Sequence, residues 1–167
     1  NGIIENFSEI KDKLTALGTS FSSQTDTEVF AQLIEYHRNQ VKARHPKHSI
    51  KENTLQAIAN AMTEVDGHYA ILLMVKGADG VLFGVQNGAP LVGSKLSNGC
   101  LIASDIQAII PYHNEVSFLP KGEILVVEQN ELYTYDPKDV REQKYLKHAP
   151  KIEKIDLSRL LYRPKEV

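Results

Sequence analysis

The hydrophobic periodicity of this sequence changes once, at Asp66-Gly67, and this change constrains the fold more than any other feature. Before it, apolar residues recur at spacings of three and four, as they do in amphipathic helices, in the segments 7–17, 26–41 and 50–65. After it, short apolar runs alternate with turn residues, which predicts strands at 69–75, 81–86, 91–93, 100–103, 115–119, 122–128 and 131–135. Helices followed by strands indicate an α+β fold.

Local signals set the expected starts and ends of the helices. Asn6 or Ser8 can cap the first helix and Gly18 can end it, because side-chain oxygens cap helix starts and glycine favours the position after a helix end. The sequences at 25–28 and 49–52 fit the Ser/Thr-x-x-Glu capping box. The second and third helices are therefore expected to begin there.

Two of the strands are expected to be buried. The run at 69–75 is apolar throughout, which is typical of a strand covered on both faces, and it should pair with 81–86 as a hairpin. The strand at 100–103 carries the only cysteine, Cys100. Its apolar neighbours and the lack of a nearby His or Lys that would lower its pKa predict a core thiol rather than a nucleophile.

Length and charge restrict the classes of function. A chain of 167 residues fits one domain, expected here at 1–135 and followed by a charged extension or packing segment at 136–167. The net charge of −2 gives no reason to expect a nucleic-acid or membrane partner. No apolar run approaches the ~18 residues of a membrane span. A single cysteine leaves no internal disulfide and suits the cytoplasm.

Two polar groupings could be interpreted as sites of chemistry, and each has a simpler interpretation. His45 and His48 lie in a basic loop without a nearby carboxylate or thiol, which is weak support for a metal and favours a solvated loop. Ser104, Asp105 and His113 are the residue types of a hydrolytic triad, but Ser104 or Asp105 is better placed to cap a short helix that follows them. We therefore expect neither a metal nor a cofactor.

Several short runs of the sequence resemble a known family. They are NGIIENF at 1–7, Leu17-Gly18, Phe21, Ser23, TDTEV at 25–29, GAPLV at 88–92 and IASD at 102–105. These runs are similar to the glutaminase domain of glutamine–fructose-6-phosphate aminotransferase, a class II glutamine amidotransferase and an N-terminal-nucleophile hydrolase. The resemblance covers about residues 1–128. It implies a four-layer α-β-β-α sandwich that is incomplete in these residues.

The resemblance also implies roles for three residues. The Asn1 side chain and the Gly2 N–H would form an oxyanion hole for the glutamine amide, because carboxamides and backbone amides are suitable donors. Asp26 would bind the amino group of glutamine, so Asn1 and Asp26 should share one pocket rim. From pattern alone, Asn-Gly favours a turn, and an acid in a first helical turn stabilises the macrodipole. For Asp26 the two interpretations are compatible.

One departure from the family affects the expected function. The family's nucleophile is a cysteine at the mature N-terminus, whereas this sequence begins with Asn1. We therefore expect the later segment of a glutaminase domain, inactive alone and lacking the N-terminal segment with the nucleophilic Cys. In a complete cytoplasmic enzyme of amino-sugar biosynthesis, expected to be a homo-oligomer, it would release ammonia from L-glutamine. A sugar-phosphate isomerase domain would use that ammonia to convert fructose-6-phosphate to glucosamine-6-phosphate. The alternative is a non-catalytic, regulatory module that binds glutamine.

Overall fold

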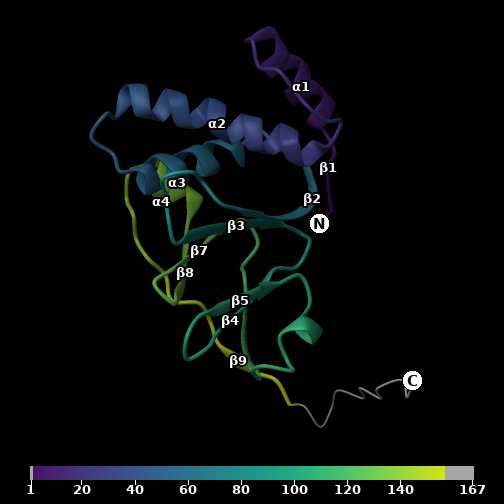
Figure 1. Cartoon of the computed structure of the whole chain (residues 1–167), viewed down its shortest axis with the longest axis vertical. Coiled ribbons are helices and arrows are strands. Elements are labelled where there is room, and N and C mark those ends of the chain that lie inside the picture. The colour runs from purple at the N-terminus through teal and green to yellow at the C-terminus, as the bar shows by residue number, and fades with distance from the viewer. Residues whose placement is uncertain (1, 157–167) are drawn as a thin grey trace.

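The computed structural model describes residues 2–156, in which helices and sheets form three layers (Figure 1). Helices α2 (Asp26–Arg44) and α3 (Ile50–Ala61) cover one face of a five-stranded sheet, and α1 (Phe7–Ala16) packs against α2. A four-stranded sheet lies on its other face. The α+β fold expected from the change in periodicity is confirmed.

Both sheets are antiparallel. The first has the order β1-β2-β3-β7-β8, with β1 (Gly2–Ile4), β2 (Gly67–Leu73), β3 (Val81–Asn87), β7 (Ile124–Glu128) and β8 (Glu131–Tyr135). The second has the order β5-β4-β6-β9, with β5 (Cys100–Ala103), β4 (Val92–Lys95), β6 (Glu115–Phe118) and β9 (Glu153–Lys154). A short 3-10 helix, η1 (Ile106–Ala108), lies between β5 and β6. Every strand expected between 69 and 135 is present, and β1 and β9 are additional.

Side chains cap the starts of α2 and α3 but not that of α1. At α3, Ser49 and Glu52 form the complete capping box, with the Ser49 N–H donating to Glu52 Oε2 at 2.8 Å. At α2, the Glu28 N–H donates to Thr25 Oγ1 at 3.3 Å, but the Glu28 carboxylate binds the preceding loop instead of closing the box. At α1, Asn6 holds the cap position without capping. Its amide bonds to the backbone of the turn that precedes β2.

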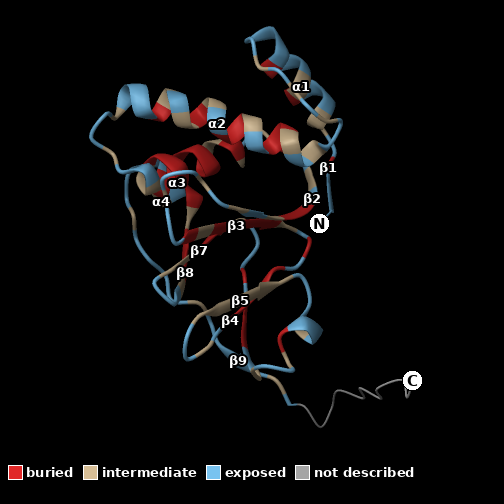
Figure 2. Ribbon diagram, in the orientation of Figure 1, coloured by how far each residue is buried: buried red, intermediate tan, exposed pale blue. Residues whose placement is uncertain are grey.

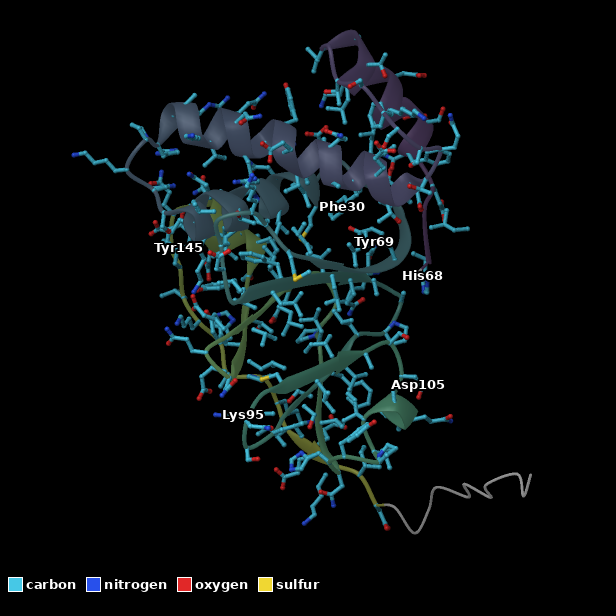
Figure 3. The ribbon with its side chains drawn as sticks, in the orientation of Figure 1. Phe30, His68, Tyr69, Lys95, Asp105 and Tyr145 are labelled. Carbon is cyan, nitrogen blue, oxygen red and sulfur yellow. The ribbon has the colours of Figure 1, made fainter. Side chains whose placement is uncertain are left out.

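The largest core lies between the helices and the five-stranded sheet. Its large, fully buried side chains include Leu14, Phe30, Leu33, Leu55, Ile58, Phe83 and Ile124. The rings of Phe30 and Tyr69 lie 5.9 Å apart between α2 and the sheet (Figure 3). Burial is concentrated in α3 and in the strands beneath it (Figure 2). Burial of each such side chain stabilises the fold by about 1.5–3 kcal/mol, so this core holds the helices against the sheet.

Two strands are less buried than their sequences predict. Leu72 in β2 is 43% exposed, and Met74 just beyond the strand is 80% exposed. The reason is that β1 pairs only with Gly67–Tyr69, so the rest of β2 lies at the edge of the sheet. Strand β5 is itself the edge of the second sheet, and all its residues are half-buried. The prediction that these strands are buried is wrong, because apolar content does not reveal an edge position.

Residues 136–156 lie against both sheets. Helix α4 (Pro137–Arg141) buries Val140 beside α3, where the Gln56 amide donates to the Val140 carbonyl at 3.0 Å. Further along, His148 bridges to β8 and β9 pairs with β6. A domain boundary at residue 135 stays a prediction, and Leu157, Leu160 and Leu161, which could pack against the sheet, lie outside the described part. Among the described residues, no helix combines the length and apolarity that crossing a membrane requires.

Candidate functional site

Strand β1 carries Gly2 at the edge of the five-stranded sheet. Gly2 lies opposite Tyr69 and has a φ of +91°. A Cβ at this position would lie 1.9 Å from the carbonyl oxygen of His68, so only glycine lets β1 and β2 approach this closely. Gly2 is therefore part of a strand and not of the turn that an Asn-Gly pair favours from pattern alone.

Asp26 is attached to the same strand. It is the first residue of α2, and its Oδ2 accepts a hydrogen bond from the Ile4 N–H at 2.8 Å. The side chain remains partly exposed. The fold thus brings Asp26 to β1, two residues along the strand from Gly2. Asn1 lies outside the described residues, and a rim shared by Asn1 and Asp26 stays a prediction.

The loop in front of α2 is folded around Glu28. Its carboxylate accepts the backbone N–H groups of Ser22 at 2.7 Å and Ser23 at 2.6 Å, and it also bonds to both hydroxyls. The backbone bond from Ser22 is the largest of several hydrogen bonds that lower the pKa of Glu28 to about 2. Glu28 therefore orders the segment that leads into Asp26. The capping pattern identified Glu28, but its binding of this loop was not predicted.

His68 and Tyr69 lie beside Gly2 on β2. The His68 ring covers Gly88, where a Cβ would lie 2.3 Å from the ring, and Figure 3 shows it near the N-terminal end of β1. Tyr69 points into the core, where burial raises the pKa of its hydroxyl to about 12. Sequence reasoning missed His68, because a single exposed histidine at the start of a strand carries no pattern.

The residues of the supposed triad do not come together. Asp105 Oδ1 accepts the Gln107 N–H at 2.8 Å and caps η1, as expected. The His113 ring contacts Ser94 instead, with 3.0 Å between Nδ1 and Oγ. The Ser94 hydroxyl donates to the Glu115 carbonyl at 2.6 Å, so this hydroxyl is bonded to the neighbouring strand β6.

The remaining candidates give no catalytic geometry. Cys100 is half-buried on β5 rather than in the core, and burial raises the pKa of its thiol, which suits an unreactive side chain. The rings of His45 and His48 stack at 4.6 Å. Within residues 2–156, no three His, Cys, Asp or Glu side chains gather as a group that could hold a metal.

The two sheets, the helical layer and the edge strand β1 define an N-terminal-nucleophile hydrolase fold. The structure is similar to that of glutamine phosphoribosylpyrophosphate amidotransferase from B. subtilis complexed with ADP and GMP, with a TM-score of 0.63 and 21% identity. The match covers 82% of this chain and 28% of that one. The sequence model of the glutamine amidotransferase domain matches residues 1–111. The chain belongs to this family.

Curated relatives agree with the resemblance seen in the short runs. Proteins named glutamine–fructose-6-phosphate aminotransferase [isomerizing] are 35% identical to it in three organisms. The match covers 131 residues in Methanocaldococcus jannaschii, 136 in Mesorhizobium japonicum and 158 in Bacteroides thetaiotaomicron. These matches take in 78%, 81% and 94% of this chain. The chain spans only 12%, 21% and 23% of those relatives.

Proposed function

We propose that the rim between β1 and the start of α2 binds L-glutamine, with its α-ammonium group on Asp26 and its side-chain amide towards Asn1 and Gly2. The observation that carries this proposal is the hydrogen bond from the Ile4 N–H to Asp26 Oδ2 at 2.8 Å. This bond holds the carboxylate against the strand of Gly2. Within residues 2–156, the other oxygen, Oδ1, accepts a hydrogen bond only from the Thr27 hydroxyl, at 3.4 Å, so it can accept one from a ligand's ammonium group.

The proposed reaction is hydrolysis of the glutamine amide. Attack by a cysteine thiolate on the amide carbon turns the carbonyl oxygen into an oxyanion, and release of ammonia leaves a thioester that water hydrolyses. The Gly2 N–H and the Asn1 carboxamide would donate to that oxyanion. Losing one such donor typically slows the reaction by about 10²–10³. The thiolate would come from outside these 167 residues, because their single cysteine, Cys100, is on the second sheet and its pKa is raised.

The ammonia has a proposed destination. The relatives' name describes transfer of an amino group from glutamine to fructose-6-phosphate. We infer that ammonia released at this site serves the same conversion to glucosamine-6-phosphate, on a sugar-phosphate isomerase domain and within a homo-oligomeric enzyme. Because the chain spans less than a quarter of those relatives, this step belongs to the whole enzyme and not to these residues alone.

A second candidate function is a non-catalytic module that binds glutamine and regulates another protein. The position of Cys100 favours it, because the only thiol of the chain is half-buried on an edge strand and has a raised pKa. Both candidates use the same contact with Asp26, so binding alone does not separate them. Ammonia release does.

The binding experiment compares L-glutamine with 4-carbamoylbutanoate, which lacks the α-amino group, by NMR titration of the 167-residue chain. Asp26→Asn keeps an oxygen that can accept the Ile4 N–H but removes the charge, and Asp12→Asn on the exposed face of α1 is the matched control. We expect Asp26→Asn to weaken glutamine binding about tenfold and to leave the analogue unaffected. Equal affinity of Asp26→Asn and the parent chain for glutamine would refute the assignment.

The hydrolysis experiment measures ammonia release from glutamine. We expect none from the chain alone. Joining the N-terminal segment of the Bacteroides relative in front of Asn1 should restore release if the domain is a glutaminase. Binding that depends on Asp26 together with no release from the joined protein would support the non-catalytic module instead.

A further inference from the structure

A cavity of about 250 Å³ lies at the opposite end of the molecule from α1, between the two sheets. Strands β4 and β6 of the second sheet, β8 of the first sheet and the segment 149–152 surround it. Figure 3 shows Lys95 from this region at the side of the second sheet, well away from His68. The cavity is therefore separate from the rim around Gly2 and Asp26.

Two buried serines, Ser94 and Ser117, line this cavity, and Ser94 already bonds to the Glu115 carbonyl. Ser117 lies opposite Gly93 in the antiparallel pair, and directly opposed residues project to the same face of a sheet. On that face a Cβ at Gly93 would lie 2.3 Å from the Leu132 side chain of β8, so Ser117 faces the space between the sheets. Ser117 is only 7% exposed, and its hydroxyl has no hydrogen-bond partner among the interactions of residues 2–156. The oxygen is not among the fully buried, unsatisfied atoms of the described residues, so it is open to the cavity and can bond to a ligand.

One ion pair and one further carboxylate lie at the entrance of the cavity. Lys95 Nζ and Glu131 Oε1 form an ion pair of 2.6 Å, and both side chains are more than half exposed. Glu115, which also lines the cavity, is exposed as well. Among the described residues that line the cavity, the only lysine is already paired, so an anion would find no free Lys or Arg. A cation that entered the interior would exchange water for an uncharged hydroxyl, which is costly. The lining therefore favours a neutral ligand.

The remaining walls are apolar. Leu132, Ala149, Pro150 and Ile152 line the cavity, and Ile152 is 64% exposed beside it. A ligand in the cavity would cover part of this exposed apolar surface. The volume lies just below the 300–1,000 Å³ typical of pockets for drug-sized ligands, so the occupant is no larger than a monosaccharide.

We propose that this cavity between the sheets binds a small neutral molecule with several hydroxyl groups, such as a polyol or a simple sugar. Ser117 bonds to a ligand hydroxyl, and the C–H side of the ligand lies against Leu132 and Ile152. The contact between the His113 ring and Ser94 fixes the wall behind it. This site takes no part in the proposed binding of glutamine.

The test is an NMR titration of the isotope-labelled chain with three probes of similar size: glucose, which is neutral, glucosamine, which is cationic, and glucose 6-phosphate, which is anionic. The variants are Ser117→Ala, which removes the hydroxyl, and Ser117→Leu, which fills the cavity. Ser97→Ala, at an exposed serine in the loop between β4 and β5, is the matched control. Retained amide spectra outside the cavity show that each variant is folded.

We expect glucose to give saturable shifts confined to amides around Ser117, Leu132 and Ile152. Ser117→Ala should weaken this binding about five- to tenfold, Ser117→Leu should abolish it, and Ser97→Ala should leave it unchanged. Absence of saturable shifts with glucose in the folded parent chain would overturn the proposal. So would stronger binding of the cationic or anionic probe, or an unchanged affinity in Ser117→Leu.

Discussion

Removing the carboxylate of Glu64 should loosen the attachment of α1 to the rest of the molecule. Glu64 lies in the turn after α3, with Oε1 2.7 Å from His37 Nε2 on α2 and Oε2 2.5 Å from Lys13 Nζ on α1. Its backbone carbonyl accepts from the Asn6 amide at 2.8 Å. Glu64, just after α3, thus connects to α1 through Lys13, to α2 through His37 and to the residue before α1 through Asn6.

The two carboxylate contacts contribute differently. The Lys13 side chain is 44% exposed, so its ion pair contributes about 0–1 kcal/mol. His37 is buried, and burial lowers its pKa although the Glu64 bond opposes this shift. At pH 7 the neutral ring therefore donates to the carboxylate, and leaving that buried donor without an acceptor costs about 1–3 kcal/mol. Together the free energy of unfolding should fall by about 1–4 kcal/mol in Glu64→Ala. It should fall by at most about 1 kcal/mol in Glu64→Gln, whose amide oxygen still accepts from His37.

Urea unfolding followed by circular dichroism at pH 7 measures both values. Glu142→Ala is the control, because Glu142 belongs to an exposed pair with Lys144 and its loss should change stability by less than about 0.5 kcal/mol. Amide hydrogen exchange should also become faster in α1 of Glu64→Ala. A loss below about 0.5 kcal/mol in Glu64→Ala, or an equal loss in Glu64→Gln, would refute the reasoning.

Three further predictions concern the strands. Gly2→Ala should speed hydrogen exchange of the β1 amides at least about tenfold, because a φ of +91° strains any other residue and such strain costs about 1–3 kcal/mol. Hydrogen bonds from Lys51 and Tyr133 lower the pKa of Glu128 below its ordinary value of 4.5. The ionised Glu128 therefore stabilises the fold fully above pH 4.5, and this stabilisation is lost as the pH falls through the lower pKa of the folded state. Glu128→Gln should flatten this loss in urea midpoints measured between about pH 7 and pH 3. Both residues of the Gln129–Asn130 turn have positive φ, so replacing them with Asn-Gly should raise the free energy of unfolding by about 1 kcal/mol and raise the Tm.

Much of the fold could be predicted from the sequence, because periodicity reports directly on which face of an element is buried. The change at Asp66-Gly67 separated the helical layer from the strands, and the capping box at Ser49 and Glu52 located the start of α3. Local patterns could not give β1 or β9, since two- and three-residue strands are defined by their partners. The exposure of Leu72 was missed for the same reason: the partner that would cover the strand determines burial, and that partner is distant in sequence.

The candidate site was predicted less evenly. The family runs singled out Gly2 and Asp26, and the structure adds a reason for each: the close approach to β2 and the bond to β1. The family runs did not reveal the bond between Ile4 and Asp26, which joins residues 22 positions apart. His68 was also missed, although its carbonyl leaves no room for a side chain at Gly2 and its ring leaves none at Gly88. Contacts between distant segments define this site, and sequence patterns of a few residues do not record such contacts.

The two acids in the first turn of α2 have different tasks, and their order in the sequence explains why. Glu28 has the longer side chain and points back along the loop, where it meets the donors of Ser22 and Ser23. Asp26, at the first position of the helix, reaches only as far as the Ile4 N–H with one oxygen. If Asp26 had to satisfy the loop as well, neither oxygen would remain for a ligand. Because Glu28 takes those donors, a carboxylate at a helix N-terminus, where negative charge is favoured, keeps one oxygen for the ammonium group that the proposed function requires.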